Sequence, residues 1–186
     1  MKRVLAREPW EECGKILDSF SSTTSPGEIT LWRSHWIALV VLLRTVGHVL
    51  KKVDARSDPV LGKIVEDHWQ YINAQKEINP LFWKFIEEER NNILKAFDVR
   101  VKVSAHTYRT ANDRGLTYHQ LVEKYGESFD LIFGEHEENA LYIAQMAHEW
   151  WDDQLRVIEV AWRQEILNPF TGDKIWDLLN MSFELD

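Results

Sequence analysis

The stretch Phe82-Trp-Lys-Phe-Ile-Glu-Glu-Glu-Arg-Asn-Asn-Ile-Leu-Lys-Ala-Phe97 decides the fold that we expect for this chain. Its apolar residues recur at steps of three and four, the spacing of one face of an α-helix. They are Phe82, Phe85, Ile86, Ile93, Leu94 and Phe97. A charged segment from Glu87 to Arg90 interrupts this pattern. We therefore predict a helix that packs one face inward and carries polar side chains in its middle.

Two cations of this helix are placed to share a site. At ~100° per residue, Arg90 and Lys95 lie about 140° apart around the helix axis. Their long side chains could therefore reach a common cleft from the two flanks of one face.

Working outward, apolar periodicity predicts helices on both sides of this stretch. Asp58-Pro59 and Asn79-Pro80 each offer a capping side chain followed by a first-turn proline, which predicts two helix starts. The polar run from Asp54 to Pro59 predicts a break between helices. The expected helices span a short N-terminal segment opened near Pro9, about 28–53, 59 onward, 80–97, 135–167 and 173–182.

Residues 98–134 break the helical pattern. Val99, Val101 and Val103 alternate with polar residues, a period of two that predicts an extended strand or arm. Thr117 to Tyr125 predicts a short helix. We interpret the whole segment as a short extended and irregular insertion.

Composition fits one folded domain over residues 1–186, with a core bundle over about 28–167. The chain has 186 residues, is 45% hydrophobic and contains nine Trp, but only five Pro and eight Gly. Such a composition supplies a core and favours long regular elements. We expect an all-α fold, an antiparallel helical bundle.

Composition also limits the setting. The longest apolar run, Trp36 to Leu43, is much shorter than the ~20 residues of a membrane span, and no signal-peptide pattern follows Met1. One cysteine, Cys13, cannot form an internal disulfide. We expect a cytoplasmic protein without membrane contact. The net charge of −8 disfavours indiscriminate nucleic-acid binding but leaves room for a local basic cleft.

The segment from Arg90 to Phe97 resembles the signature of HEPN domains. In that signature an Arg, usually followed by a polar residue or Asn, precedes a His by a short spacer, and an aromatic residue often follows. Arg90, Asn91 and Phe97 match the pattern, whereas Lys95 stands where the family has its His. The surrounding helices, from about Leu31 to Leu167, resemble the family's all-α bundle.

The resemblance implies metal-independent RNA cleavage in a cleft across a homodimer, often in toxin–antitoxin or phage-defence systems. This chemistry needs a base for the ribose 2′-hydroxyl and a cation near the developing phosphorane. Arg90 could supply the cation. An ordinary lysine is protonated at neutral pH, so Lys95 would need a strongly lowered pKa to act as the base. The departure therefore favours a binding domain that has lost catalysis, or one that uses another His.

Other residues offer alternative sites. Arg44 and His48 are four apart on the central helix and could join Arg90 from a facing helix. His148 and Asp152, one helical turn apart, form the best candidate metal pair, although a solvated acidic face is the more common explanation of such a pair. For His48, the more common explanation is a histidine that forms hydrogen bonds in the core. Cys13 fits a core position. We predict no metal or other cofactor.

We thus expect Arg90, Asn91, Lys95 and His48 to line the site of an RNA-cleaving or RNA-binding homodimer, with a protein such as an antitoxin as a further partner. Two alternatives stay open. One is a non-catalytic dimerisation or protein-interaction module, which the tryptophans and the missing His favour. The other is a metal-dependent helical-bundle enzyme.

Overall fold

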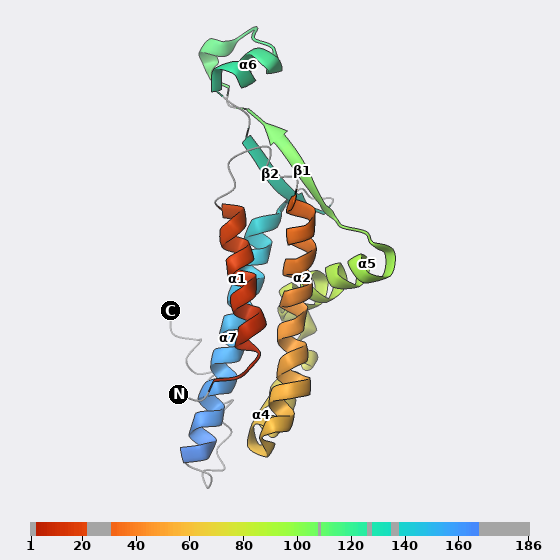
Figure 1. The fold of residues 1–186 in the computed structure, drawn as a ribbon, viewed down its shortest axis with the longest axis vertical. Helices are drawn as coiled ribbons and strands as arrows, with labels where there is room; N and C mark the ends of the chain where they lie inside the picture. The colour runs from red at the N-terminus through yellow and green to blue at the C-terminus, as the bar shows by residue number, and fades with distance from the viewer. Residues whose placement is uncertain (1–2, 22–30, 108, 126–127, 135–137, 168–186) are drawn as a thin grey trace.

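A computed structural model describes residues 3–21, 31–107, 109–125, 128–134 and 138–167. The chain is mostly helical and carries a small three-stranded sheet (Figure 1). The expected all-α class is therefore confirmed. None of the helices described is long and apolar enough to cross a membrane.

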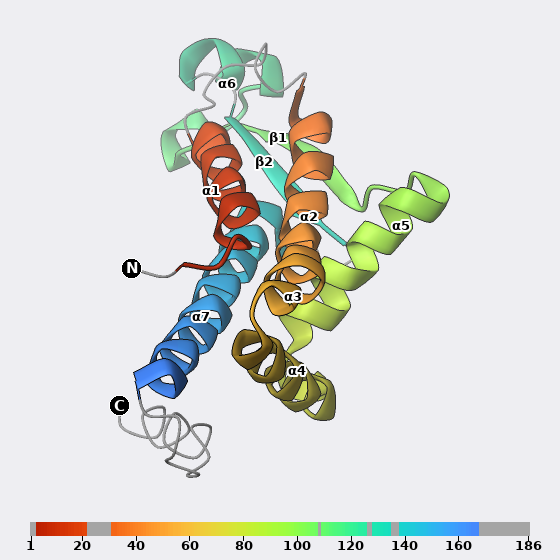
Figure 2. The same cartoon turned by 60° about the horizontal axis from the view of Figure 1, so that its bottom comes forward.

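The helices build one layered bundle. Helix α1 packs against α2 and α7, α4 packs against α7, and α5 crosses α2 and points away from the bundle (Figures 1 and 2). The helical elements are α1 (Arg7–Ser21), α2 (Trp32–Val49), η2 (Leu50–Asp54), α3 (Ala55–Ser57), α4 (Pro59–Ala74), η3 (Lys76–Ile78), η4 (Leu81–Glu87), α5 (Glu88–Ala96), η5 (Ala111–Asp113), α6 (Tyr118–Tyr125) and α7 (Ala140–Leu167).

The predicted break over residues 54–59 exists, but its predicted onset at Asp54 is wrong. Helix α2 continues through the π-helical η2 into α3, and the chain leaves helical geometry only at Asp58. Asp54 is buried because its carboxylate accepts hydrogen bonds from the backbone N–H groups of Leu5 at 2.8 Å and Ala6 at 2.9 Å. A distant segment therefore satisfies an acidic side chain that, by local rules, favours a turn.

One of the two predicted caps is confirmed. Asp58 accepts from the N–H groups of Val60 and Leu61, and Pro59 occupies the first turn of α4. Asn79 does not cap the next helix. Its Nδ2 donates to the Gln75 carbonyl and its Oδ1 accepts from the Trp150 indole, so a long-range contact takes its capping group.

The predicted inward face of η4 and α5 is confirmed in part. Phe82, Phe85, Ile86 and Ile93 are buried in the core. The prediction is wrong at the C-terminal end, where Leu94 is 56% exposed and Phe97 64% exposed. Phe97 ends the helix in the left-handed region, with φ of 51°. The last turn of α5 thus leaves the bundle and presents these two side chains outward.

The segment with alternating valines forms a strand, as predicted, and this strand pairs with a second one. Strand β1 (Val101–His106) runs antiparallel to β2 (Ser128–Phe133), which pairs briefly with β3 (Glu138–Asn139). The sequence pattern predicts no strand over Ser128–Phe133, so the interpretation of that part as irregular is wrong. We call residues 99–134 the arm; Figure 1 shows it extending beyond the ends of α1 and α2, with α6 at its far end.

Helix α7 is the predicted long C-terminal helix, although it begins at Ala140, after β3. Trp151 is 1% exposed and Trp150 is partly exposed, although the two neighbouring indoles contact each other with ring centres 4.9 Å apart. The helix predicted over residues 173–182 lies outside the described residues, as does the start predicted near residue 28.

Candidate nucleic-acid interface

The motif residues Arg90 and Asn91 lie in the middle of α5. Arg90 is partly buried, and its Nη1 donates to Asn91 Oδ1 at 2.9 Å. Asn91 is also partly buried. The two motif residues therefore contact each other at the edge of the helix's packed face.

Lys95 and His48 are both exposed, Lys95 in the last turn of α5 and His48 in the last turn of α2. Over the described part of the chain, the Arg90–Asn91 hydrogen bond is the one polar contact that joins any two of the four predicted site residues. Arg90 and Lys95 stay on separate flanks of α5, as the helical spacing requires.

Arg44, which was expected to join Arg90, contacts the motif-bearing segment at Glu87. Arg44 on α2 pairs through its Nε with the carboxylate of Glu87, the last residue of η4. Glu87 stands three residues before Arg90, which is one turn of helix. This ion pair fastens the middle of α2 to the segment that carries the motif.

Three basic residues share one face of the helix that runs through α2 into η2. Arg44, His48 and Lys51 follow one another at steps of four and three, which aligns their side chains. We call these three residues the α2 basic face. Lys52 beside it is exposed as well.

Two cations of the α2 basic face lie over aromatic rings. The Arg44 guanidinium is 5.8 Å from the centre of the Phe82 ring, and the Lys51 ammonium is 5.4 Å from the Trp69 ring. The two rings contact each other edge to face at 5.2 Å. Cations held over rings at this distance gain a favourable electrostatic contact. The same helix face is thus both basic and aromatic.

The rings belong to a larger aromatic cluster, made of Trp69, Phe82, Trp83, Trp150 and Trp151. Its three outer tryptophans, at 69, 83 and 150, are partly exposed, and Lys76 lies 4.4 Å from the ring of Trp83. Sequence reasoning assigned the tryptophans to core and interface packing. In the structure, Lys51 and Lys76 lie beside this cluster. The helices that carry the tryptophans are far apart in sequence, so the positions of these two lysines were the one sequence signal for such a cluster.

The three consecutive glutamates of the motif helix do different things. Glu87 pairs with Arg44, while Glu88 and Glu89 both pair with Arg100 at the base of β1, at 3.0 and 2.7 Å. Glu89 is completely buried and also accepts from the indole of Trp36 at 3.3 Å. The charged segment is therefore an anchor between α2, α5 and the arm, and sequence reasoning missed the burial of Glu89.

The remaining candidate histidine, His148, contacts α1. His148 stacks on Trp10 with ring centres 4.6 Å apart, and its Nε2 lies 3.0 Å from the Trp10 carbonyl. Asp152, its proposed metal-binding companion, pairs with Arg7. In the part of the chain that is described, no group of three or more His, Cys, Asp or Glu is arranged to hold a metal ion.

Two buried groups behave as core residues. Burial lowers the pKa of His68 to about 4, which keeps its ring neutral at pH 7. Burial raises the pKa of Cys13 to about 12, so the thiol is not a nucleophile at neutral pH. The core position predicted for Cys13 is confirmed.

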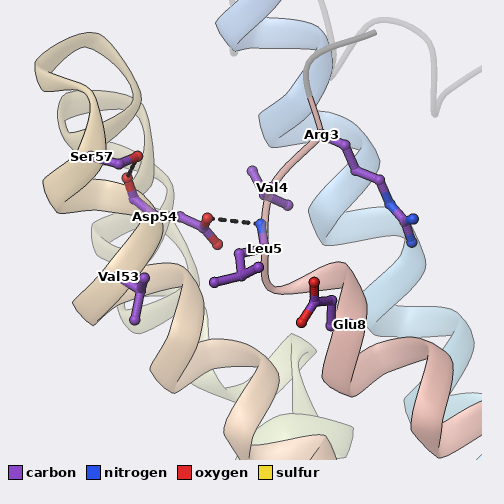
Figure 3. A pocket seen from close by; sticks show the side chains of 7 residues that line it. All are labelled: Arg3, Val4, Leu5, Glu8, Val53, Asp54 and Ser57. Carbon is purple, nitrogen blue, oxygen red and sulfur yellow. Dashed lines mark hydrogen bonds between the residues drawn. The ribbon is translucent and has the colours of Figure 1, made fainter.

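An open pocket lies where the N-terminal segment meets η2 and α3 (Figure 3). Asp54 faces it, but its carboxylate accepts from the backbone of Leu5 and Ala6. Desolvation raises the pKa of Asp54, against the effect of those two hydrogen bonds. The pocket is therefore a contact region between the N-terminal segment and η2, in which backbone N–H groups of the first bind the Asp54 carboxylate of the second. Its lining residues are Arg3, Val4, Leu5, Glu8, Val53, Asp54 and Ser57.

Comparison of the chain with family models, with curated proteins and with solved structures gives no match.

Proposed function

We propose that this chain binds single-stranded RNA through the α2 basic face and the partly exposed tryptophans beside it. The observation that carries the proposal is the alignment of Arg44, His48 and Lys51, with both cations held over rings of one aromatic cluster. Proteins that bind single-stranded nucleic acid combine cations for the phosphates with aromatic side chains on which bases stack. The resemblance of the motif helix to HEPN domains supports the same substrate.

The net charge of −8 does not oppose a local site of this kind. Among the residues described, Lys51 has one carboxylate within ion-pair distance, that of Glu66 at 3.9 Å, which is a long ion pair. The Lys51 side chain is 42% exposed. A phosphate can approach Lys51 while the ring of Trp69 stays in place beneath it.

Binding to a labelled single-stranded RNA, followed by fluorescence anisotropy over a range of salt concentrations, tests this proposal. We expect Lys51→Gln to weaken binding several-fold and to reduce the slope of log affinity against log salt by about 0.7, the loss of one phosphate contact. Lys15→Gln is the matched control, because Lys15 is an exposed lysine that also pairs with one glutamate but lies on α1. Equal effects of both substitutions, or no binding by the wild type at low salt, would refute the proposal.

A second candidate function, RNA cleavage, is favoured by the exposed His48 between the two cations of the α2 basic face. Histidine is the commonest general acid–base residue, and the neighbouring arginine could stabilise negative charge on a phosphorane. In this proposal His48, on α2, takes the part that the family gives to the residue at position 95. Asn91 accepts from Arg90 and so positions that guanidinium.

The cleavage test compares His48→Ala with Lys95→Ala on an all-ribose oligonucleotide and on one with 2′-deoxyribose throughout. We expect cleavage of the ribose strand alone, abolished by His48→Ala and retained by Lys95→Ala. If the wild type binds RNA without cleaving it, the proposed binding function stands and the proposed cleavage function is refuted. Loss of cleavage in Lys95→Ala, with His48→Ala active, would assign the acid–base role to the motif position.

A further inference from the structure

Strand β1 forms one edge of the sheet. Within the part of the chain that the structure describes, the strand order is β1-β2-β3, so β1 has a paired neighbour there on one side only. An edge strand presents a row of N–H and C=O groups that can pair with a strand of another chain. Figure 1 shows this strand in the arm, with its outer end beyond the ends of α1 and α2.

One hydrogen bond establishes which backbone groups of β1 face outward. The Gly134 N–H donates to the Arg100 carbonyl at 3.1 Å, and the register places these two residues opposite each other. In an antiparallel pair, hydrogen-bonded positions alternate with positions whose N–H and C=O point away. Lys102 and Ser104 therefore turn their backbone groups toward β2. Val101, Val103 and Ala105, in contrast, turn theirs to the open edge.

These outward groups have no partner among the residues that the structure describes. Val101 is buried at the base of the arm, Val103 is partly buried and Ala105 is exposed. The open edge therefore reaches solvent along its outer half. A further strand paired with β1 would satisfy these outward N–H and C=O groups. It would also stabilise the arm, because two paired strands alone are marginally stable.

We infer that two copies of this chain pair through their β1 strands, antiparallel, across a two-fold axis at Val103. In this register Val103 lies opposite the partner's Val103, and Val101 lies opposite the partner's Ala105. Each of these pairs exchanges both hydrogen bonds through the outward-facing groups. The two sheets then become one continuous sheet of six strands, β3-β2-β1 followed by the same order reversed.

Side chains favour this register over a shift by one residue and over an axis at Lys102. A shift by one residue would join the apolar face of one strand to the polar face of the other. Pairing centred on Lys102 would place two ammonium groups directly opposite each other, which is destabilising. With the axis at Val103, Lys102 lies opposite the partner's Ser104, and the valines of both strands continue one apolar face.

Charge also favours a second copy as the occupant of this edge. The whole chain has a net charge of −8, but residues 99–134 contain five Lys or Arg and four Asp or Glu. Two arms therefore repel each other less than two bundles do. A two-fold pair of identical strands is self-complementary and closed, so it ends at a dimer.

The test measures the mass of the full chain in solution by light scattering, with two substitutions at Ala105. We expect a dimer for the wild type and for Ala105→Thr, which keeps the N–H. Ala105→Pro removes an outward donor without touching the ladder to β2, and it should raise the dimer dissociation constant at least tenfold. A monomeric wild type, or an Ala105→Pro variant that dimerises like the wild type, would overturn the inference.

A cross-linking pair serves if Ala105→Pro does not fold. Residues opposite each other at the axis have Cα atoms about 5.5 Å apart, within the usual range of a disulfide. Val103→Cys should therefore link two chains on mild oxidation. Ala105→Cys is the control, since the axis separates the two copies of that position by four residues, about 14 Å along the strand. Failure of Val103→Cys to cross-link, or equal cross-linking at both positions, contradicts this register.

Discussion

The buried carboxylate of Glu89 should be one of the most sensitive positions for stability. It accepts hydrogen bonds from the Trp36 indole, the Arg100 backbone N–H and the Arg100 Nε, at 3.3, 3.2 and 2.7 Å. Glu89→Ala would leave these donors without their acceptor inside the protein. Removing one member of a buried ion pair costs about 3–5 kcal/mol of unfolding free energy.

The lower end of that range applies here, because Arg100 keeps Glu88 as a partner and its side chain is 28% exposed. We expect a loss of about 3 kcal/mol for Glu89→Ala by the buried-pair argument. For a chain of this length that corresponds to a fall in melting temperature of about 6–12 °C. Glu89→Gln, which keeps one acceptor oxygen, should lose less.

Urea denaturation followed by tryptophan fluorescence at pH 7 measures these differences. Glu88→Ala is the matched control: it removes the exposed partner of the same arginine, and exposed ion pairs contribute about 0–1 kcal/mol. A Glu89→Ala variant as stable as the wild type, or no more destabilised than Glu88→Ala, would refute the reasoning. A double-mutant cycle with Arg100→Ala should give a coupling energy well above that of the exposed pair.

Three further predictions concern other parts of the chain. Burial lowers the pKa of His68 from 6.5 to about 4, so on acidification the unfolded chain binds a proton at His68 before the folded chain does. The contribution of neutral His68 to stability is therefore complete above about pH 6.5, and the free energy of unfolding falls by up to about 3 kcal/mol toward pH 4. Urea denaturation across that range should show this fall in the wild type but not in His68→Leu. Gly47→Ala should destabilise the protein by about 1–3 kcal/mol because its new Cβ would lie 2.9 Å from the rigid Trp151 ring. Gly14→Ala, whose Cβ would lie 3.5 Å from its nearest neighbour, should stabilise the protein by up to about 1 kcal/mol. Thermal melts of the two variants measure both effects. Asp113→Ala should open the end of the arm to limited proteolysis while the melting temperature of the bundle stays unchanged, since this buried carboxylate holds Thr110, Lys124 and Tyr125 together.

Features set by neighbouring residues were predictable from the sequence. The spacing of Phe82, Phe85 and Ile86 predicts the buried side of the motif helix, and the alternating valines predict β1. Asp58-Pro59 predicts the start of α4, because the cap and the first-turn proline act within one turn.

Features set by distant contacts were not predictable. The predicted onset of the break at Asp54 is wrong because the N-terminal segment donates two backbone N–H groups to that carboxylate. Asn79 does not cap the helix that follows it, because its Oδ1 accepts a hydrogen bond from the indole of Trp150 on α7. Of the candidate site, a contact between Arg44 and the motif helix was expected as an alternative, but the partner expected was Arg90 and the partner found is Glu87. The cations over Phe82 and Trp69 were not, since they depend on the packing of three separate helices.

The three glutamates before Arg90 give the motif helix its place between the two proposed surfaces. Glu87 fastens it to the α2 basic face through Arg44, and Glu89 fastens it to the base of β1 through Arg100. Because the two anchors point to different elements, their effects should separate. Disruption of the Arg44 anchor should alter RNA binding while the dimer persists. Loss of the Arg100 anchor should loosen the base of the arm and weaken β1 pairing, with the α2 basic face left in place. A single substitution that abolished both properties in a folded protein would show that the two surfaces are one.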